Sequence, residues 1–393
     1  MHEHKQNPCK RKVKHRKTVM SLMIFCITVC VALMFIYVQK RRKEIDARQK
    51  WLESVLSEEK EWILENQGPE GEIYMNGSKA GDVNPYFACI AALGLLAETE
   101  NCPITDAEKK AVARYLDWHS RMLLETDGKM GIYRKEGEKL IYKDKADSED
   151  GYLGMYLFLM GEYLEKTEST DLPEDWEKGI RLALKKLQSL MQDGITQVSE
   201  ENTTAYLMDN LEVWKGLYKL EQAGVEDARL ICALREKLQE QIENTFWDEE
   251  HQKWRIIRNS DQYDPTEFYP DGVAQIYPLI YEFPVKEKKK QKVLYAQFTE
   301  NFQWQKLSER STNFLWTMTG MAAAQVGDIH RLMELLRNYK TEYSAERKYP
   351  LYTGEAGWIC MECEKLYELY EEKYGWNIVE RAVSAARSTL RSS

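Results

Sequence analysis

Residues 148–164 read SEDGYLGMYLFLMGEYL, and this stretch decides the fold. A polar opening of Ser148, Glu149 and Asp150 is followed by residues that are apolar or small on nearly every face of a helix. A surface helix carries one apolar stripe, whereas a helix that is apolar all round is buried. The stretch therefore predicts a buried helix that begins at a polar cap.

Five further segments have the same character, each with a polar and aromatic opening: 84–96, 204–220, 269–281, 311–325 and 354–370. They alternate with amphipathic, highly charged segments that are typical of outer helices: about 46–66, 106–126, 173–191, 226–246, 287–300 and 328–339. The spacing is too long and irregular for tetratricopeptide repeats. The alternation predicts an all-α fold, an (α/α)6 toroid of six helical hairpins over residues 61–375.

In such a toroid the inner helices form a barrel, and their N-terminal ends face one mouth. Helix N-termini present free N–H groups, and the segments that enter the inner helices carry most of the unusual polar and aromatic residues. We therefore expect the functional site at this mouth. Each opening taken singly is also explained as an ordinary helix cap.

The N-terminal part of the chain has a separate organisation. Residues 18–39 carry no charge and would span roughly 33 Å as a helix, which predicts a transmembrane anchor. A cleaved signal peptide is the alternative, but no A-x-A-like site follows and residues 40–43 are basic. We expect residues 1–17 to form a basic cytoplasmic tail, 40–60 a juxtamembrane stalk running into the first helix, and 376–393 a C-terminal helix and tail.

We expect the orientation of a signal anchor, with one helix in the lipid bilayer and the C-terminal domain on the extracytoplasmic side. Lys and Arg are nearly balanced on the two sides of residues 18–39, so the positive-inside rule alone does not decide it. The five cysteines after residue 43 leave at least one unpaired, which favours a reducing compartment instead. The disulfide state, protein partners and oligomeric state stay open.

Charge excludes nucleic acid as a partner. The chain has a formal net charge of -9, yet its first 43 residues are strongly basic, so the remainder is more acidic still. An acidic surface repels phosphate, which disfavours nucleic acids beyond the N-terminus and favours neutral or cationic substrates.

The sequence offers few or none of the residues that several classes of enzyme need for catalysis. After the N-terminal segment, His119, His251 and His330 are the only histidines, each in or beside an outer helix. No G-x-S-x-G, G-x-G-x-x-G or Walker motif occurs. Cys360 and Cys363 have C-x-x-C spacing without a second ligand pair, so they are interpreted as helix packing. No metal and no cofactor are expected.

The residues that remain as candidates for catalysis are carboxylates, which lie among aromatic residues at the start of the predicted inner helices. Two carboxyl groups across a cleft are what glycosidic hydrolysis needs, one protonated and one ionised. The candidate catalytic residues are Asp147, Asp150, Asp209 and Glu212. The candidate substrate-binding residues are Tyr86, Tyr133, Tyr152, Tyr206, Trp214, Tyr269, Asp271, Trp316, Glu355 and Trp358. Caps, solvated acids and core aromatics are the alternative for any one of them.

These residues carry a resemblance. The order of PEGEIYM (69–75), DGKMGIYR (127–134), ADSEDGY (146–152), YPDG (269–272) and EAGW (355–358) resembles bacterial members of the six-hairpin glycosidase superfamily, the (α/α)6-barrel glycoside hydrolases. It covers about residues 60–375. ADSEDGY is similar to the D-S-x-D-S-Y turn of those proteins, and more distantly to the A-x-D-x-D segment of glycoside hydrolase family 8.

The resemblance implies that Asp147 and Asp150 lie in a sugar cleft. Two features depart from the family pattern: the E-G-x-x-Y-G-M segment of family 8 is absent, and Gly151 replaces a small hydroxyl residue. The expected function is hydrolysis of glycosidic bonds in a cell-surface or exported polysaccharide. A non-catalytic glycan-binding or scaffold toroid in an export assembly, and a lyase or epimerase on the same barrel, stay open.

Overall fold

The computed structural model describes residues 8–77, 81–137, 139–169, 172–225, 227–307 and 313–374. Within the first helix it describes the side chains of residues 22, 23, 25, 26, 28–30 and 32 onward. The chain divides into two compact units, residues 1–51 with 370–393, and residues 52–369, which we call the body. The predicted C-terminal helix and tail (376–393) and the first seven residues of the predicted tail lie outside the described residues.

Helix α1, Pro8–Glu65, is one unbroken helix that contains the predicted anchor, the stalk and the first outer helix. In the smaller unit, Gln49 on α1 donates from Nε2 to Oε1 of Glu371 over 2.5 Å. Within the described residues, no helix is both long and apolar enough to cross a membrane. The predicted anchor begins at Thr18, and its first four side chains lie outside the described residues.

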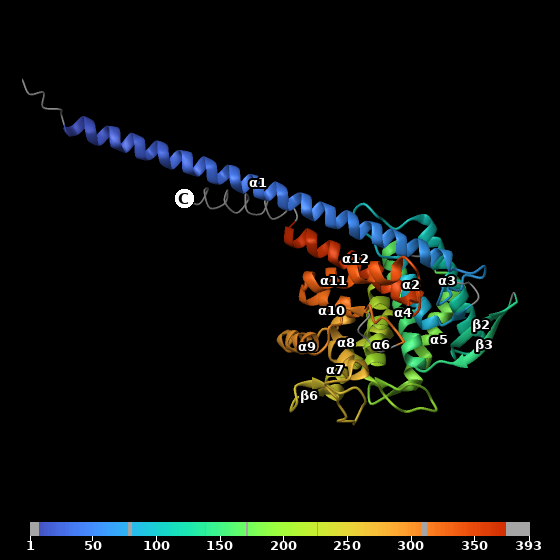
Figure 1. Cartoon of the computed structure of the whole chain (residues 1–393). Coiled ribbons are helices and arrows are strands. Elements are labelled where there is room, and N and C mark those ends of the chain that lie inside the picture. The colour runs from blue at the N-terminus through green and yellow to red at the C-terminus, as the bar shows by residue number, and fades with distance from the viewer. Residues whose placement is uncertain are drawn as a thin grey trace, which may run out of the picture. The chain divides into compact units, whose positions relative to one another are not determined.

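The helical fold of the body is confirmed, and its helices alternate in the predicted order. The outer helices after α1 are α3 (Asp106–Glu125), α5 (Glu174–Leu190), α7 (Ala228–Phe246), α9 (Lys288–Asn301) and α11 (Ile329–Tyr339). The inner helices are α2 (Pro85–Leu95), α4 (Glu149–Thr167), α6 (Leu207–Gln222), α8 (Val273–Ile280), α10 (Thr319–Val326) and α12 (Thr353–Tyr374). In Figure 1, α9 and α5 lie on opposite sides of α4 and α6.

Local sequence explains the two kinds of helix. On α5, Trp176, Ile180, Leu184 and Leu187 recur at three- and four-residue spacing and are buried, while the opposite face is charged. On α4 nearly every residue from Asp150 to Gly161 is buried. The hydroxyl of Ser148 caps α4 by accepting from the backbone N–H of Gly151.

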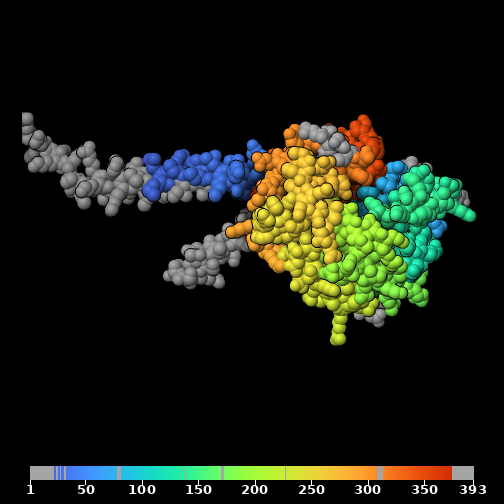
Figure 2. Space-filling model, turned by 90° about the horizontal axis from the view of Figure 1, so that it is seen from below, coloured from blue at the N-terminus to red at the C-terminus, as the bar shows by residue number. Residues whose placement is uncertain are grey.

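The inner helices close into a ring. Along the chain, α2 packs on α4, α4 on α6, α6 on α8 and α8 on α10. A Cβ on Gly320 of α10 would lie 2.4 Å from Glu362 of α12, and one on Gly94 of α2 would lie 2.5 Å from Gly357 of α12. Gly94 and Gly357 let the backbones of α2 and α12 approach closely, and Gly320 leaves room for the side chain of Glu362. In Figure 2 the colours follow chain order around the body, from teal through green and yellow to orange.

Short strands correct the prediction that the chain is entirely helical. A three-stranded antiparallel sheet has the order β1 (Asp82–Val83), β2 (Gly131–Glu136), β3 (Lys139–Lys145). Two-stranded ribbons join β4 (Met191–Gln192) to β5 (Ile195–Thr196), and β6 (Trp247–Asp248) to β7 (Lys253–Trp254). Every strand lies between an outer helix and the next inner helix, so all of them sit at the end of the barrel where inner helices begin.

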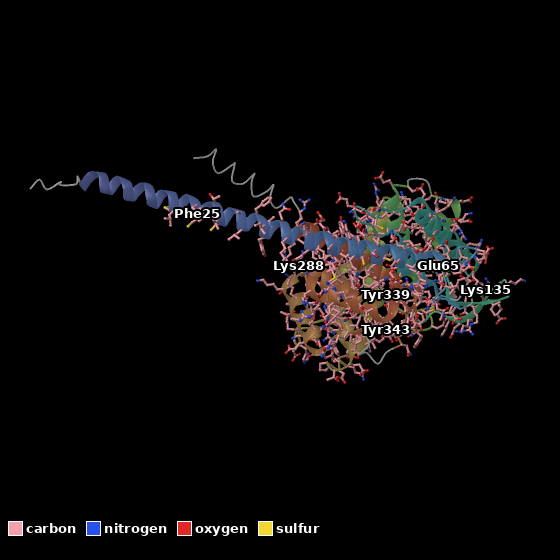
Figure 3. The ribbon with its side chains drawn as sticks, turned by 45° about the horizontal axis from the view of Figure 1, so that its top comes forward. Phe25, Glu65, Lys135, Lys288, Tyr339 and Tyr343 are labelled. Carbon is pink, nitrogen blue, oxygen red and sulfur yellow. The ribbon has the colours of Figure 1, made fainter. Side chains whose placement is uncertain are left out.

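The last turns of α1 belong to the outer layer of the body. The carboxylate of Glu59 is fully buried and accepts hydrogen bonds from the hydroxyls of Tyr339 over 2.7 Å and Ser344 over 2.6 Å. Arg347 adds a short ion pair to the same carboxylate. Tyr339 and Tyr343 lie on α11 and on the π-helical turn Lys340–Ser344 that follows it (Figure 3). A buried carboxylate with three donors fixes this part of α1 against α11.

Candidate active site

A cavity of about 690 Å³ opens at the N-terminal ends of the inner helices, where the site was expected. Its wall takes residues from the β1–α2 segment, the β3–α4 loop, the first turns of α6, the loop before α10 and the start of α12. Of the predicted site residues, the cavity brings together Asp147, Asp209, Glu212, Tyr86, Tyr152, Tyr269, Trp316, Glu355 and Trp358.

Glu212 lies at the inner wall of the cavity and is held by tyrosines from two other helices. Its Oε1 accepts from the hydroxyls of Tyr86 and Tyr277, each over 2.6 Å, and from that of Tyr281 over 3.4 Å. The residue is 3% exposed. Burial raises the pKa of Glu212 to about 7, while the hydroxyls of Tyr277 and Tyr86 act in the opposite direction. At neutral pH this carboxyl group is poised between its two protonation states.

Asp209 lies one helical turn before Glu212 on α6 and also lines the cavity. The residue is half-buried, but its Oδ2 atom is buried and has no hydrogen-bond partner among the described residues. Burial, followed by the nearby negative charges of Asp150 and Glu212, raises the pKa of Asp209 well above its ordinary value. The environment of Asp209 therefore favours its protonated form.

Asp147 is the exposed carboxylate of the cavity wall. It lies between β3 and Ser148, the residue that caps α4. Its side chain is open to solvent, whereas those of Asp209 and Glu212 are largely withdrawn from it. The three carboxyl groups thus share one cavity but have very different access to water.

Asp150 does not line the cavity, although it follows Asp147 by three residues. It is fully buried. Its Oδ1 accepts from Ser148 over 2.8 Å and from the backbone N–H of Gly151 over 3.1 Å, and its Oδ2 accepts from Thr196 over 2.7 Å. Burial raises the pKa of Asp150 to about 6, against these hydrogen bonds. Its contacts tie the start of α4 to β5.

The space around residue 151 explains why it is a glycine and not the small hydroxyl residue of the similar proteins. A Cβ at this position would lie 2.8 Å from Oε2 of Glu212 and 2.9 Å from Oγ of Ser148. Real Cβ atoms do not approach other atoms that closely. Glycine at this position therefore leaves room for the carboxyl group of Glu212 beside the first turn of α4.

Tyr269 and Trp316 form an aromatic pair on the cavity wall, with ring centroids 4.2 Å apart. Tyr269 is 43% exposed. Glu355 lines the cavity too, but its carboxylate accepts from the backbone N–H groups of Leu315, Trp316 and Thr317 over 2.9–3.0 Å. Glu355 therefore positions the loop that carries Trp316.

Besides Asp150, four predicted substrate-binding residues lie outside the cavity wall. Tyr133 is on strand β2 and packs against Trp118 and Tyr142. Trp214 is buried and stacks on Tyr218. The remaining two are Tyr206, which pairs with Ile257 in an isolated β-bridge, and Asp271, which accepts from the backbone N–H of Asp264. The side chains of Tyr133 and Trp214 therefore serve packing, and that of Asp271 supports a loop.

Sequence reasoning missed several residues of the wall. Asn84 lines the cavity and caps α2, with Oδ1 accepting from the backbone N–H of Tyr86 over 2.9 Å. The sequence did contain a signal for this role of Asn84, since Asn followed by Pro is a common start of a helix. Tyr277 has no such signal, because it lies inside a helix and reaches Glu212 only through the closed ring. Other wall residues that were not predicted include Phe87, Asn313, Phe314 and Met318.

Within the described residues, no group of three His, Cys, Asp or Glu side chains is arranged to hold a metal ion. Cys360 and Cys363, the C-x-x-C pair, are both fully buried in α12. Burial raises the pKa of both thiols well above the ordinary value.

Solved structures share the architecture. A glycosidase variant solved in complex with glucose matches with a TM-score of 0.57 and 11% sequence identity, over 84% of this chain and 98% of that chain. The chain has a glycoside hydrolase-like fold. An α-amylase from Clostridium perfringens matches with a TM-score of 0.52 and 15% identity, over 80% of this chain and 97% of that chain. No protein-family model and no curated protein matches the sequence. At these identities the likeness shows the fold alone.

Proposed function

We propose that the body hydrolyses glycosidic bonds, with Asp209 as the proton donor. The observation that carries this proposal is the buried Oδ2 of Asp209, which has no hydrogen-bond partner among the described residues, on a cavity wall that also holds the exposed Asp147. The raised pKa of Asp209 favours the protonated form, which a general acid requires.

The two carboxyl groups take complementary roles. Asp209 gives its proton to the oxygen of the leaving sugar as the bond from the anomeric carbon breaks. Asp147 supplies the second carboxylate, which either activates water or attacks the anomeric carbon. Glu212 supports the role of Asp209, because the negative charge of its ionised form raises the pKa of Asp209. Each of these roles uses a side chain of the cavity wall.

The proposed substrate is a polysaccharide of neutral or amino sugars. Tyr269 and Trp316 offer flat rings with polar edges, which suit the apolar faces of pyranose rings. Acidic residues outnumber the one lysine, Lys145, in the described part of the cavity wall. Asp82 is ion-paired with Arg134 and Lys143, and Asp209 is neutral in its proposed role, which leaves Asp144, Asp147, Glu212 and Glu355. Such a wall disfavours uronates and other anionic sugars.

A digestion screen on a polysaccharide panel tests the activity. Hydrolysis adds reducing ends without ultraviolet absorbance, a lyase adds an unsaturated product, and a glycan-binding scaffold binds without turnover. Asp209→Asn is expected to lower turnover about 10²–10⁴-fold, the range for one general acid, with the melting temperature unchanged or raised. Normal turnover by this variant on every cleaved polymer would contradict the role of Asp209.

We also propose that α1 anchors the body to a membrane through residues 18–39, with the body extracytoplasmic. Support comes from the uncharged sequence and from large apolar side chains that are exposed on α1, among them Leu22, Phe25 (Figure 3) and Phe35. Protease treatment of intact cells tests it. Cleavage of the body in intact cells is expected, and protection until lysis would contradict this orientation.

A further inference from the structure

A second cavity, of about 220 Å³, lies on the outer layer of the body between α7 and α9. The β6–β7 ribbon forms one side of it through Trp247 and Trp254, and Gln291 of α9 forms the other. None of its lining residues belongs to the wall of the active-site cavity. Any ligand bound here would be separate from the reacting sugar.

Two residues that line this cavity each have a buried polar atom without a hydrogen-bond partner within the described residues. These atoms are Nε1 of Trp254, a donor, and Oε1 of Gln291, an acceptor. The two residues are 2% and 3% exposed. A buried polar atom without a partner costs free energy, so such atoms mark places where a ligand or water completes the structure. The cavity far exceeds the ~10–15 Å³ that a single water needs.

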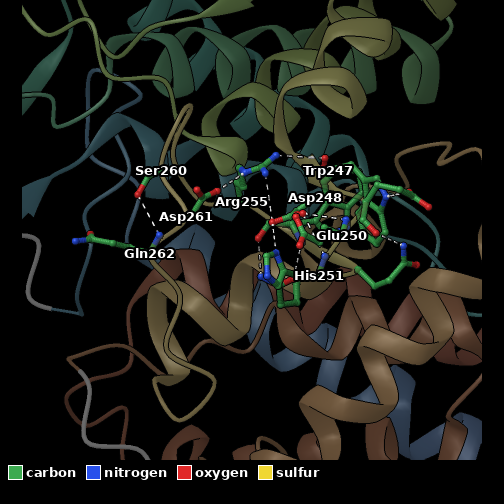
Figure 4. Close-up of polar contacts among 12 residues, drawn as sticks. Trp247, Asp248, Glu250, His251, Arg255, Ser260, Asp261 and Gln262 are labelled. Carbon is green, nitrogen blue, oxygen red and sulfur yellow. Dashed lines mark hydrogen bonds and ion pairs between the residues drawn. The ribbon is translucent and has the colours of Figure 1, made fainter.

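The ribbon that carries both tryptophans is held rigidly. Oδ1 of Asp248 accepts from the backbone N–H groups of Glu250 and His251, and its Oδ2 binds Nδ1 of His251 over 2.9 Å (Figure 4). The side chain of Gln275 on α8 pairs with both the N–H and the C=O of Trp254. A preorganised frame of this kind lowers the entropy lost on binding.

The tryptophan rings meet edge to face, with centroids 5.0 Å apart. Trp247 is half-buried, and its Nε1 already donates to Glu249 over 2.6 Å, so only the indole N–H of Trp254 is unpartnered among the described residues of this cavity. The lysines of the cavity are paired: Lys290 with Glu249 and Glu287, and Lys286 with Glu243. Because these lysines are already paired, the cavity has no strong preference for an ionic ligand.

We propose that this cavity is a second binding site for a neutral saccharide, distinct from the active site. A sugar hydroxyl both accepts and donates, so the hydroxyls of a saccharide match the N–H of Trp254 as acceptors and Oε1 of Gln291 as donors, once small side-chain shifts expose these two atoms. The C–H face of the sugar ring packs on the part of the Trp247 ring that Trp254 and Lys290 leave exposed. The choice of a saccharide among hydroxyl-bearing molecules rests on the proposed function. A second site of this kind holds a polymer on the body between cleavage events.

Fluorine NMR of the full chain labelled with 5-fluorotryptophan tests the proposal, in a medium free of sugar-based detergents. Glucose, galactose and N-acetylglucosamine are titrated separately, and the signals of Trp247 and Trp254 are assigned with the Trp→Phe variants. At least one of these sugars is expected to shift both signals saturably at millimolar concentration. Gln291→Met, which removes the acceptor and keeps the side-chain length, is expected to weaken that binding at least tenfold.

Gln305→Met is the matched control, because Oε1 of Gln305 also lacks a partner among the described residues but lies outside the cavity. It is expected to leave binding unchanged. The proposal is overturned if no sugar shifts these signals, if only the signals of Trp316 and Trp358 respond, or if Gln291→Met binds as the unsubstituted chain does. The readout is binding at Trp254, so failure of hydrolysis at the active site is detected separately.

Discussion

The hydroxyl of Tyr86 on α2 donates to Oε1 of Glu212 on α6 over 2.6 Å, a contact between residues 126 positions apart in the chain. Tyr277 on α8 donates to the same oxygen over the same distance. One carboxyl group therefore joins three inner helices at the base of the cavity. Its protonation state links the stability of the barrel to the charge of the proposed active site.

Glu212 is expected to make the stability of the body depend on pH. Its pKa is about 7 in the folded chain, against 4.5 ordinarily, so the folded state binds a proton more tightly. This contribution to folding is complete below about pH 4.5 and is lost as pH rises through 7, on the order of a few kcal/mol in total. Melting temperatures measured between pH 5 and 8 should fall less steeply in Glu212→Gln than in the unsubstituted chain.

Glu65→Gln is the control for that measurement, because Glu65 is an exposed carboxylate at the end of α1 (Figure 3). Its melting curve should follow the unsubstituted chain at every pH. Equal pH dependence in Glu212→Gln and the unsubstituted chain would show that the carboxyl group of Glu212 is not the source of the effect.

Asp150 is expected to act in structure rather than in catalysis. Asp150→Asn keeps an oxygen for Ser148 and Gly151, so turnover should stay within about tenfold of the unsubstituted chain well below its melting temperature. Asp150→Ala leaves the buried hydroxyl of Thr196 with one acceptor fewer and should lower the free energy of unfolding by about 1–3 kcal/mol. Loss of turnover in Asp150→Asn at an unchanged melting temperature would instead place Asp150 in the mechanism.

The contrast between Asp150 and Asp209 shows what residue spacing can predict. Asp209 and Glu212 both lie inside α6, and residues three apart on a helix share a face, so both line the cavity as expected. Asp147 and Asp150 have the same spacing, but Ser148 caps α4 with an extended backbone, so Asp147 lies before the helix. The spacing rule does not hold across a cap, and the two side chains diverge.

The fold could be predicted from the sequence because the patterns of apolar and charged residues repeat along the chain. Alternation of all-apolar and amphipathic segments predicted both layers, since each pattern follows directly from the helical period. The strands were missed although Asp193-Gly194 carried a signal: both residues have positive φ, +54° and +90°, as a two-residue hairpin turn requires. The convergence of Tyr86 and Tyr277 on Glu212 depends on ring closure, which local patterns do not contain.

Gly151→Ser is expected to disturb Glu212 directly. The added Cβ would lie 2.8 Å from Oε2 of Glu212, whose other oxygen is already held by tyrosines, so the carboxyl group cannot simply move away. We expect a cost of about 1–3 kcal/mol from overpacking and a fall in turnover larger than the loss of stability explains. Gly77→Ser is the control, since its Cβ would meet nothing closer than 3.4 Å among the described residues. Full activity in Gly151→Ser would contradict the placement of Glu212 beside α4.

Glu355→Gln is expected to weaken substrate binding and to spare the chemical step. Trp316 adopts a positive φ of +54°, a backbone conformation that costs a non-glycine residue about 1–3 kcal/mol and needs support. Glu355 gives that support by accepting three backbone N–H groups with two carboxylate oxygens, a task that the NH₂ group of glutamine cannot share. The loop should then relax and separate Trp316 from Tyr269.

Steady-state kinetics on the best polymer from the digestion screen measure this effect. KM should rise about tenfold, which corresponds to about 1.4 kcal/mol of lost binding, while kcat stays nearly constant. Trp316→Ala should raise KM similarly, and Glu355→Gln should add little in the Trp316→Ala background, because both changes remove the same contact. If kcat collapses at constant KM, Glu355 takes part in the reaction itself, and the proton donor must be sought between Glu355 and Asp209.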